Sequence, residues 1–212
     1  MTDQALRHTP LHKTHVLLEA KMMPYAGWEL PRSYGKQKPE DEVRAVRKKA
    51  GVFDVSHMGQ LFVSGPHALL FMERVITQKM DMPKGSARYG LILNENGTVL
   101  DDCISYRLEE SEFLIIVNAA NRDKIVAWFL AREENGVSIA DRSDEFALIA
   151  LQGPLAESIL ERALIGNSLP EKPYTFAWNR SFVTQCGHDV LVSRTGYTGE
   201  DGFELMIESA HA

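Results

Sequence analysis

Two adjacent carboxylates, Asp101 and Asp102, are the residues of this sequence whose placement most strongly indicates chemistry. They lie in Thr98–Arg107, which alternates as a β-strand does, so the two side chains point to opposite faces. The face of Asp102 also carries Leu100, Ile104 and Tyr106 and is the more apolar, so we expect Asp102 to point inward and Asp101 to be solvated. Burying a carboxylate is costly unless it is paired, so Asp102 needs a partner, such as a turn or Arg88, or a function.

A glycine-rich loop over Ser193–Glu204 is the second candidate. Its three glycines allow the backbone to approach another group closely, Tyr197 offers an aromatic face, and Glu204 begins the next strand. The loop lacks the Gly-Lys-Ser/Thr ending of a phosphate-binding loop, and its acids would repel phosphate. An ordinary acidic hairpin would explain the glycines but not the placement of Tyr197 and Glu204.

The histidines and cysteines indicate less. His57, within Phe53–Gly59, could act as an acid or base near neutral pH, but a lone histidine is more often structural. No nucleophilic triad or dyad can be assembled from the sequence. Cys103 and Cys186 are the only cysteines and are typical of free thiols in a reducing compartment. No Cys/His cluster has zinc-ligand spacing, so we expect no metal.

Composition excludes several classes of protein. The chain has 212 residues, 25% charged and 44% hydrophobic, as globular proteins do, and a net charge of -6 that gives no general attraction for nucleic acid. No apolar run is long enough to span a membrane. The first residues resemble neither a secretory signal nor a good mitochondrial transit peptide. We therefore expect a bacterial cytoplasmic protein, or a mitochondrial matrix protein if the source is eukaryotic.

The elements that would position these residues indicate an α+β fold. A helix is expected from Pro39, and residues 55–140 are expected to follow the order β-α-β-β-β-α-β, related to the ferredoxin-like arrangement. Further on, we expect a strand and a helix, and after them another strand over Tyr174–Val183. The pattern strand, Gly-Pro, helix occurs at Gly65 and again at Gly153, which indicates either a duplicated unit or a common way to open a helix.

Taken together, the sequence resembles the aminomethyltransferase (T-protein) family of the glycine cleavage system. Each shared motif is moderately specific and their ordered set is highly specific. The resemblance runs essentially from end to end, through Thr9–His12, Tyr25–Pro31, Glu42–Arg47, Gly51–Gly59, Asn94–Asp102, Val117–Asn121, Leu151–Pro154 and Val192–Glu204.

The resemblance implies a multi-domain, cloverleaf-like fold around a tetrahydrofolate site, with tetrahydrofolate as a co-substrate and no metal. The reaction would take the aminomethyl group from the lipoyl arm of the H-protein, pass its methylene carbon to tetrahydrofolate and release ammonia. In the family the second Asp of the pair is catalytic, which implies Asp102 here, the residue that strand parity also selects. The implied folate contacts are Met58, Tyr89, Tyr106, Asn118, Tyr197 and Glu204.

These contacts have physical reasons. A carboxylate such as Glu204 can accept two adjacent N–H groups of a pterin ring, and tyrosine rings can pack on its plane. The resemblance also implies a discontinuous first domain, residues 1–54 plus 141–212, and an inserted second domain, residues 55–140. Family members continue well past residue 212, so a third domain would be absent. We therefore expect weak folate binding and little or no transferase activity from this chain alone.

Three alternatives stay open. One is a folate-dependent demethylase, or the folate-binding part of a sarcosine or dimethylglycine dehydrogenase, which would share much of the site. Another is a non-catalytic folate-binding module that assists iron–sulfur maturation; such relatives lack the catalytic Asp and carry a Cys motif that is missing here. The last is an interaction protein without a ligand. Neither nucleic acid nor a membrane is an expected partner.

Overall fold

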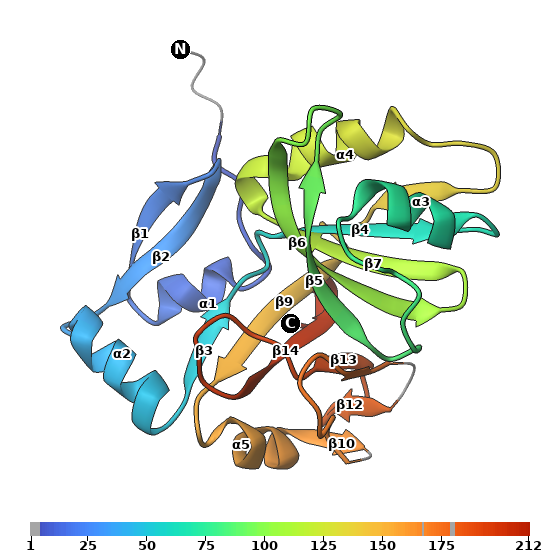
Figure 1. Ribbon diagram of the computed structural model, residues 1–212. Coiled ribbons are helices and arrows are strands. Elements are labelled where there is room, and N and C mark those ends of the chain that lie inside the picture. The colour runs from blue at the N-terminus through green and yellow to red at the C-terminus, as the bar shows by residue number, and fades with distance from the viewer. Residues whose placement is uncertain (1–4, 167, 179–180) are drawn as a thin grey trace. The chain divides into compact units, whose positions relative to one another are not determined.

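The computed structural model describes residues 5–166, 168–178 and 181–212 (Figure 1). The chain divides into two compact units. Unit 1 takes the described residues of Met1–His57, Asp144–Pro173 and Asn179–Ala212, and unit 2 takes Met58–Ser143 and Tyr174–Trp178. The predicted α+β class is confirmed, since both units combine helices with antiparallel strands.

Unit 2 is built on one antiparallel sheet with the strand order β5-β6-β7-β4-β8 (Figure 1). Without β5, its elements follow the β-α-β-β-α-β order of ferredoxin-like units. Its strands and helices are β4 (Gly59–Ser64), α3 (Ala68–Val75), β5 (Ala87–Leu93), β6 (Val99–Glu109), β7 (Glu112–Val117), the short helix η1 (Ala119–Asn121), α4 (Arg122–Leu130), β8 (Ser138–Asp141) and β11 (Phe176–Ala177).

Helices α3 and α4 pack on one face of this sheet and form the core of unit 2. Phe71 of α3 and Phe129 of α4 meet edge to face, with ring centroids 5.6 Å apart. Every second side chain of the strands points into the same core, which includes Leu61, Val63, Ile92, Cys103, Phe113, Ile115 and Val117. The opposite face of the sheet is therefore the one free of these two helices.

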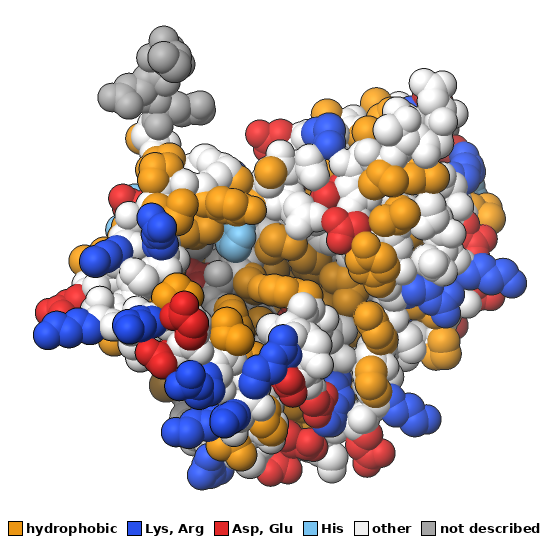
Figure 2. Space-filling model, turned by 60° about the vertical axis from the view of Figure 1, so that its left-hand side comes forward, with side chains coloured by type: hydrophobic (Ala, Val, Ile, Leu, Met, Phe, Trp, Pro, Cys, Tyr) orange, Lys and Arg blue, Asp and Glu red, His pale blue; other side chains and the backbone are white. Residues whose placement is uncertain are grey.

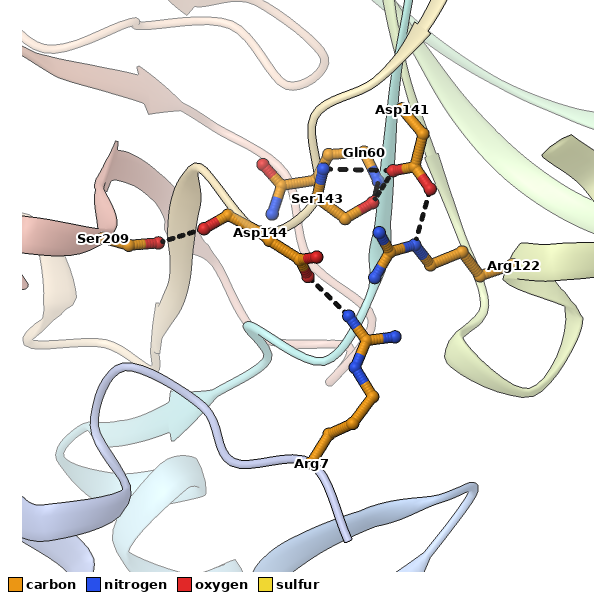
Figure 3. A network of polar contacts seen from close by, with 7 residues as sticks. All are labelled: Arg7, Gln60, Arg122, Asp141, Ser143, Asp144 and Ser209. Carbon is orange, nitrogen blue, oxygen red and sulfur yellow. Dashed lines mark hydrogen bonds and ion pairs between the residues drawn. The ribbon is translucent and has the colours of Figure 1, made fainter. Parts of the chain in front are cut away.

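A polar network fixes the edge strand β8 within unit 2 (Figure 3). Asp141 accepts a hydrogen bond from Arg122 Nε at 2.8 Å and from the backbone N–H of Ser143 at 3.1 Å. Ser143 Oγ in turn accepts the N–H of Gln60 at 2.7 Å. Burial would raise the pKa of Asp141, but the hydrogen bonds from Arg122 and Ser143 outweigh it and lower that pKa.

Unit 1 contains an antiparallel sheet with the order β13-β14-β9-β3, a β1–β2 hairpin and a small β10–β12 pair. Its elements are α1 (His12–Leu17), β1 (Ala20–Tyr25), β2 (Trp28–Tyr34), α2 (Pro39–Lys48), β3 (Gly51–Asp54), β9 (Phe146–Gln152), α5 (Ala156–Ala163), β10 (Leu164–Gly166), β12 (Phe182–Thr184), β13 (Val190–Ser193), β14 (Gly202–Glu208) and the short helix η2 (Ser209–His211).

The N-terminal segment and the short helix η2 of unit 1 both contact Asp144 (Figure 3). Arg7 Nη2 lies 2.5 Å from the Asp144 carboxylate, and Ser209 Oγ donates to the Asp144 carbonyl at 3.1 Å. The Arg7 guanidinium also lies 4.3 Å from the ring centroid of Trp28 in β2. These contacts fix the segment that precedes α1.

The single strand predicted over Tyr174–Val183 is wrong. Within that range the described residues form β11 in unit 2 and part of β12 in unit 1, and residues 179–180 lie outside the described part of the chain. Phe176 of β11 donates its N–H to the Gly85 carbonyl at 2.8 Å, so β11 is bonded to unit 2. Both Gly-Pro sites do connect a strand to a helix, β4 to α3 and β9 to α5.

The surface and the helices add two observations. No helix in the described residues is long and apolar enough to cross a membrane. On the face that Figure 2 presents, Lys and Arg side chains lie beside Asp and Glu side chains, so positive and negative charges are mixed there.

Candidate functional site

The two carboxylates of β6 lie the opposite way round from the prediction. Asp101 is 4% exposed, whereas Asp102 is exposed to solvent. The alternation of residues within β6 predicted the wrong buried face. Which face packs under the helices depends on the neighbouring strands, and β6 alone does not show this. Asp101 pairs in register with Ile92, and Cys103 pairs with Val117, and both partners belong to the helix-covered core.

Asp101 is a buried carboxylate whose hydrogen bonds are supplied locally. It accepts the backbone N–H of Asn118 at 3.0 Å, the side-chain amide of Asn118 at 2.8 Å and the side-chain amide of Asn121 at 2.7 Å. These charge-assisted bonds offset the cost of burying the carboxylate. Asp101 thus fixes the turn after β7, a role that the sequence did not reveal.

Asp102 is held from the same turn. Asn118 Nδ2 donates to Asp102 Oδ1 at 2.8 Å, so one amide group bridges both carboxylates. The Tyr89 hydroxyl also hydrogen-bonds to Asp102, and partial desolvation together with the Asp102 charge raises the pKa of Tyr89. An exposed carboxylate with a fixed orientation is available to a substrate, which a buried one would not be.

Five of the candidate residues belong to unit 2. Strand register places Tyr89, Asp102 and Tyr106 on one face of its sheet, and Met58 and Asn118 adjoin the ends of β4 and β7. Tyr89 pairs with Ile104, which lies between Asp102 and Tyr106 on that face, and Met58 precedes Gly59, the partner of Val117 next to Asn118. This face is opposite to the one that α3 and α4 cover.

The five are not equally accessible. Tyr89 is 51% exposed, but Tyr106 is 3% exposed and its ring meets Phe176 edge to face, with centroids 5.4 Å apart. The structure therefore brings Asp102, Asn118 and Tyr89 together at the open end of the face and places Tyr106 in packed surroundings.

Tyr197 and Glu204, the other two candidates, belong to unit 1. Glu204 lies in β14, where the Thr195 hydroxyl hydrogen-bonds to its carboxylate. Tyr197 is exposed, and partial desolvation and the charge of Glu204 raise the pKa of its hydroxyl. The glycine-rich loop thus presents an aromatic ring near a carboxylate.

The glycines of this loop allow its backbone to pack closely against another residue of unit 1, Gln152. A Cβ atom on Gly196 would lie 2.0 Å from Gln152 Oε1, and one on Gly202 would lie 2.7 Å from Gln152 Cα. Gln152 is fully buried in β9 and donates to the Thr195 carbonyl at 3.1 Å. Gly196 and Gly202 are therefore explained by packing of the loop on Gln152, whereas Gly199 adopts a positive φ of 80°.

Unit 1 also holds a pocket of about 760 Å³ that the sequence did not predict. Its lining includes Tyr197, Tyr34, Asp54 and His57. His15 connects two of these residues, because its Nε2 lies 2.9 Å from Asp54 Oδ2 and its Nδ1 lies 2.7 Å from the Tyr34 hydroxyl. Burial raises the pKa of Tyr34, as does the charge of Asp54.

Asp54 anchors this part of unit 1. Its side chain is 1% exposed and accepts hydrogen bonds from Thr9 Oγ1 at 2.6 Å and from the backbone N–H of Ser56 at 3.0 Å. Burial would raise the pKa of Asp54, but the hydrogen bonds from Ser56, Thr9 and His15 outweigh it, so the pKa is lowered. Asp54 is therefore held as an ion.

His57 does not resemble a poised catalytic base. Burial lowers its pKa, an effect that the charge of Asp54 only partly opposes. Its Nδ1 is buried and has no hydrogen-bond partner among the described residues, and its ring meets Tyr25 edge to face at 6.1 Å. We interpret His57 as a neutral lining residue of the pocket.

Comparisons with known proteins show which family the chain matches. The GCVT N-terminal domain matches residues 11–212. The aminomethyltransferase of Thermotoga sp. (strain RQ2) is 45% identical over 98% of the chain, and that of Bacillus pumilus is 43% identical over 98%. The chain spans about half the length of these relatives, since it covers 56% of each.

Solved structures give the same result. Glycine cleavage system aminomethyltransferase T from Bartonella henselae matches with a TM-score of 0.87 and 33% identity, over 98% of this chain and 55% of that one. The heterotetrameric sarcosine oxidase from Corynebacterium sp. U-96 matches with a TM-score of 0.63 and 13% identity, over 96% of this chain and 88% of that one. The second likeness concerns the fold alone.

Proposed function

Because the chain belongs to the GCVT N-terminal domain family, we propose that it carries the folate-binding and catalytic residues of a glycine cleavage system aminomethyltransferase. The substrates would be the aminomethyl group on the lipoyl arm of the H-protein and tetrahydrofolate. The methylene carbon passes to tetrahydrofolate, which gives 5,10-methylenetetrahydrofolate, and ammonia is released. The H-protein is the proposed protein partner, and the bacterial cytoplasm the proposed location.

One observation carries this proposal: Asp102 is an exposed carboxylate whose orientation is fixed by Asn118 at 2.8 Å. Loss of the thiol leaving group gives the transferred carbon iminium character. A fixed negative charge stabilises such a developing positive charge, and it can also accept a proton as the folate ring closes. Asp102 is the catalytic residue of this proposal, and Asp101 is a positioning residue that acts through Asn118.

The residues of unit 1 support folate recognition. Glu204 can accept two adjacent N–H groups of a pterin, and Tyr197 offers a ring for packing on the pterin or aminobenzoyl plane. In unit 2, Tyr89 shares the face of Asp102, and Asn118 and Met58 adjoin the ends of its strands, so all three can contact the same ligand class. Tyr106 belongs to the proposed set through the family resemblance, and its packing against Phe176 makes it a supporting residue of that face.

The test is a single-turnover assay of methylene transfer. The chain is used in excess over aminomethylated H-protein, at a high tetrahydrofolate concentration, so that weak folate binding does not limit the rate and the low activity expected of this chain alone can be measured. Asp102→Asn should lower the transfer rate by about 100-fold or more, since it removes the charge and keeps the shape. A variant with a near-normal rate would contradict the assignment of Asp102.

The same assay separates the competing function. A folate-dependent demethylase would transfer carbon from methylated amines or sulfonium compounds rather than from the H-protein. Transfer from those compounds, with none from the aminomethylated H-protein, would replace the proposed function with the demethylase.

A further inference from the structure

Three potential metal ligands meet in unit 1, although the sequence predicted no metal site. His12 Nε2 lies 2.7 Å from Glu29 Oε2, and His8 Nε2 lies 3.3 Å from the same oxygen. The ligand atoms of the three residues all lie within 4.8 Å of one another. The side chains are 53% exposed for His8, 16% for His12 and 34% for Glu29, so an ion can reach them from solvent.

Backbone contacts, rather than the side chains themselves, bring these residues together. Arg7 forms a parallel bridge with Trp28, through its N–H to the Gly27 carbonyl and its carbonyl to the Glu29 N–H, both at 2.9 Å. The bridge places His8 beside Glu29. The turn that leads into α1 is closed by the His12 N–H and the Thr9 carbonyl at 3.1 Å, which brings His12 back to His8.

This arrangement is further fixed on both sides. The pairing of Arg7 with Asp144 holds the residue before His8 (Figure 3). On the other side, His15 in α1 lies 2.9 Å from the Asp54 carboxylate. The backbone that carries the three ligands is therefore pre-organised, which reduces the ordering cost of binding an ion.

The donor set specifies the kind of ion. Two imidazole nitrogens and one carboxylate oxygen suit zinc and the neighbouring divalent transition metals, whereas magnesium and calcium prefer oxygen ligands. Zinc–ligand distances near 2.0–2.1 Å correspond to a tetrahedral edge of about 3.3 Å. The His8–Glu29 distance of 3.3 Å equals that edge, and the His12–Glu29 distance of 2.7 Å must lengthen. The two imidazoles are stacked with centroids 3.7 Å apart, so they must also tilt for both Nε2 lone pairs to point at one ion.

We propose that His8, His12 and Glu29 bind one divalent transition-metal ion, with zinc as the reference ion, through two Nε2 atoms and one carboxylate oxygen. Solvent occupies the fourth position. The ion joins the N-terminal segment, α1 and β2, which the Arg7–Trp28 bridge and the His15–Tyr34 hydrogen bond already connect. None of the residues assigned to folate binding or methylene transfer takes part. A test of this metal site therefore does not depend on whether the proposed function is correct.

A metal-free explanation predicts something different. The two imidazoles, stacked with centroids 3.7 Å apart, could simply donate N–H groups to one oxygen of Glu29. In that case zinc would bind no more tightly here than at any other pair of surface histidines. The stacked pair His188 and His211, with centroids 3.5 Å apart, is such a pair and belongs to no three-ligand group among the described residues.

The experiment measures zinc binding by the 212-residue chain after treatment with a chelator. Equilibrium dialysis with elemental analysis should give about one zinc ion per chain, and cobalt should give the visible spectrum of a tetrahedral site. His8→Asn, His12→Asn and Glu29→Gln should each weaken zinc binding by about tenfold or more. His188→Asn, the matched control, should leave it unchanged.

The exposed position of His8 makes His8→Asn the decisive variant, since its folding is easily kept and can be checked by circular dichroism. The proposal is overturned if the wild-type chain binds no zinc at one equivalent. It is equally overturned if folded His8→Asn binds zinc as tightly as the wild type, or if His188→Asn weakens binding as much as His8→Asn does.

Discussion

The side-chain amide of Asn118 donates one hydrogen bond to Asp101 and one to Asp102, each at 2.8 Å. Two adjacent carboxylates therefore have different tasks although one group holds both. The buried one fixes the turn that carries Asn118, and the exposed one is presented to the substrate. Adjacent positions on a strand suit this division because they face opposite sides of the sheet.

Substitution of the two carboxylates should separate these tasks in a stability measurement. Asp101→Asn places an amide against the donors of Asn118 and Asn121, so it should lower the free energy of unfolding by about 1.5–3 kcal/mol. Asp102→Asn, at an exposed position, should stay within about 0.5 kcal/mol of the wild type. Urea denaturation followed by circular dichroism measures both. Equal losses for the two variants would contradict the division.

Asp54 should make the stability of the chain depend on pH in the acidic range. Its pKa is lower in the folded chain than the ordinary value of 3.8, so its contribution is fully present above that value and is lost as the pH falls through the folded pKa. Asp54→Asn should lower the unfolding free energy by about 1.5–3 kcal/mol at pH 7 and by progressively less as the pH falls below 3.8.

A surface carboxylate provides the control for this effect. Asp144 is 69% exposed and pairs with Arg7, and such pairs contribute little. Asp144→Asn should therefore change stability by less than about 1 kcal/mol at every pH. If Asp54→Asn and wild type lose stability in parallel from pH 7 to pH 3, Asp54 is not the group responsible.

The two cysteines should differ sharply in reactivity. Burial in the unit 2 core raises the pKa of Cys103 to about 12, whereas Cys186 is exposed. Since the thiolate is the reactive form, a disulfide reagent at pH 8 should modify Cys186 quickly and Cys103 only when unit 2 opens. Cys186→Ser should abolish the fast phase, and urea should restore rapid labelling of Cys103. A fast phase that persists in Cys186→Ser would be inconsistent with the packed core.

Much of unit 2 could be predicted from the sequence. Its strands alternate strongly and its helices open at clear signals, so the order of elements followed from local pattern. The face of Asp102 could not be predicted in this way, because it depends on which neighbouring side chains, such as Ile92 and Val117, share the helix-covered side. Pairing between strands is long-range information that a single strand does not contain.

Unit 1 was harder for similar reasons. The β1–β2 hairpin is interrupted by Pro24 and Pro31 and its first strand is mostly exposed, so it lacks the alternation that marks a strand. The His8–His12–Glu29 group depends on the bridge between Arg7 and Trp28, and the spacing of these residues along the chain gives no sign of it. By contrast, Tyr197 and Glu204 could be proposed from the sequence because they belong to a glycine-rich loop that is visible in it.

Calorimetric titration of tetrahydrofolate into the 212-residue chain tests the central claim most directly. We predict weak, saturable binding that Glu204→Gln weakens by about tenfold or more, because a two-pronged, charge-assisted contact is lost. Glu208→Gln, in the same strand but exposed, and Asp102→Asn should leave the affinity nearly unchanged. Absence of saturable binding, or equal affinity for the wild type and Glu204→Gln, would contradict the account.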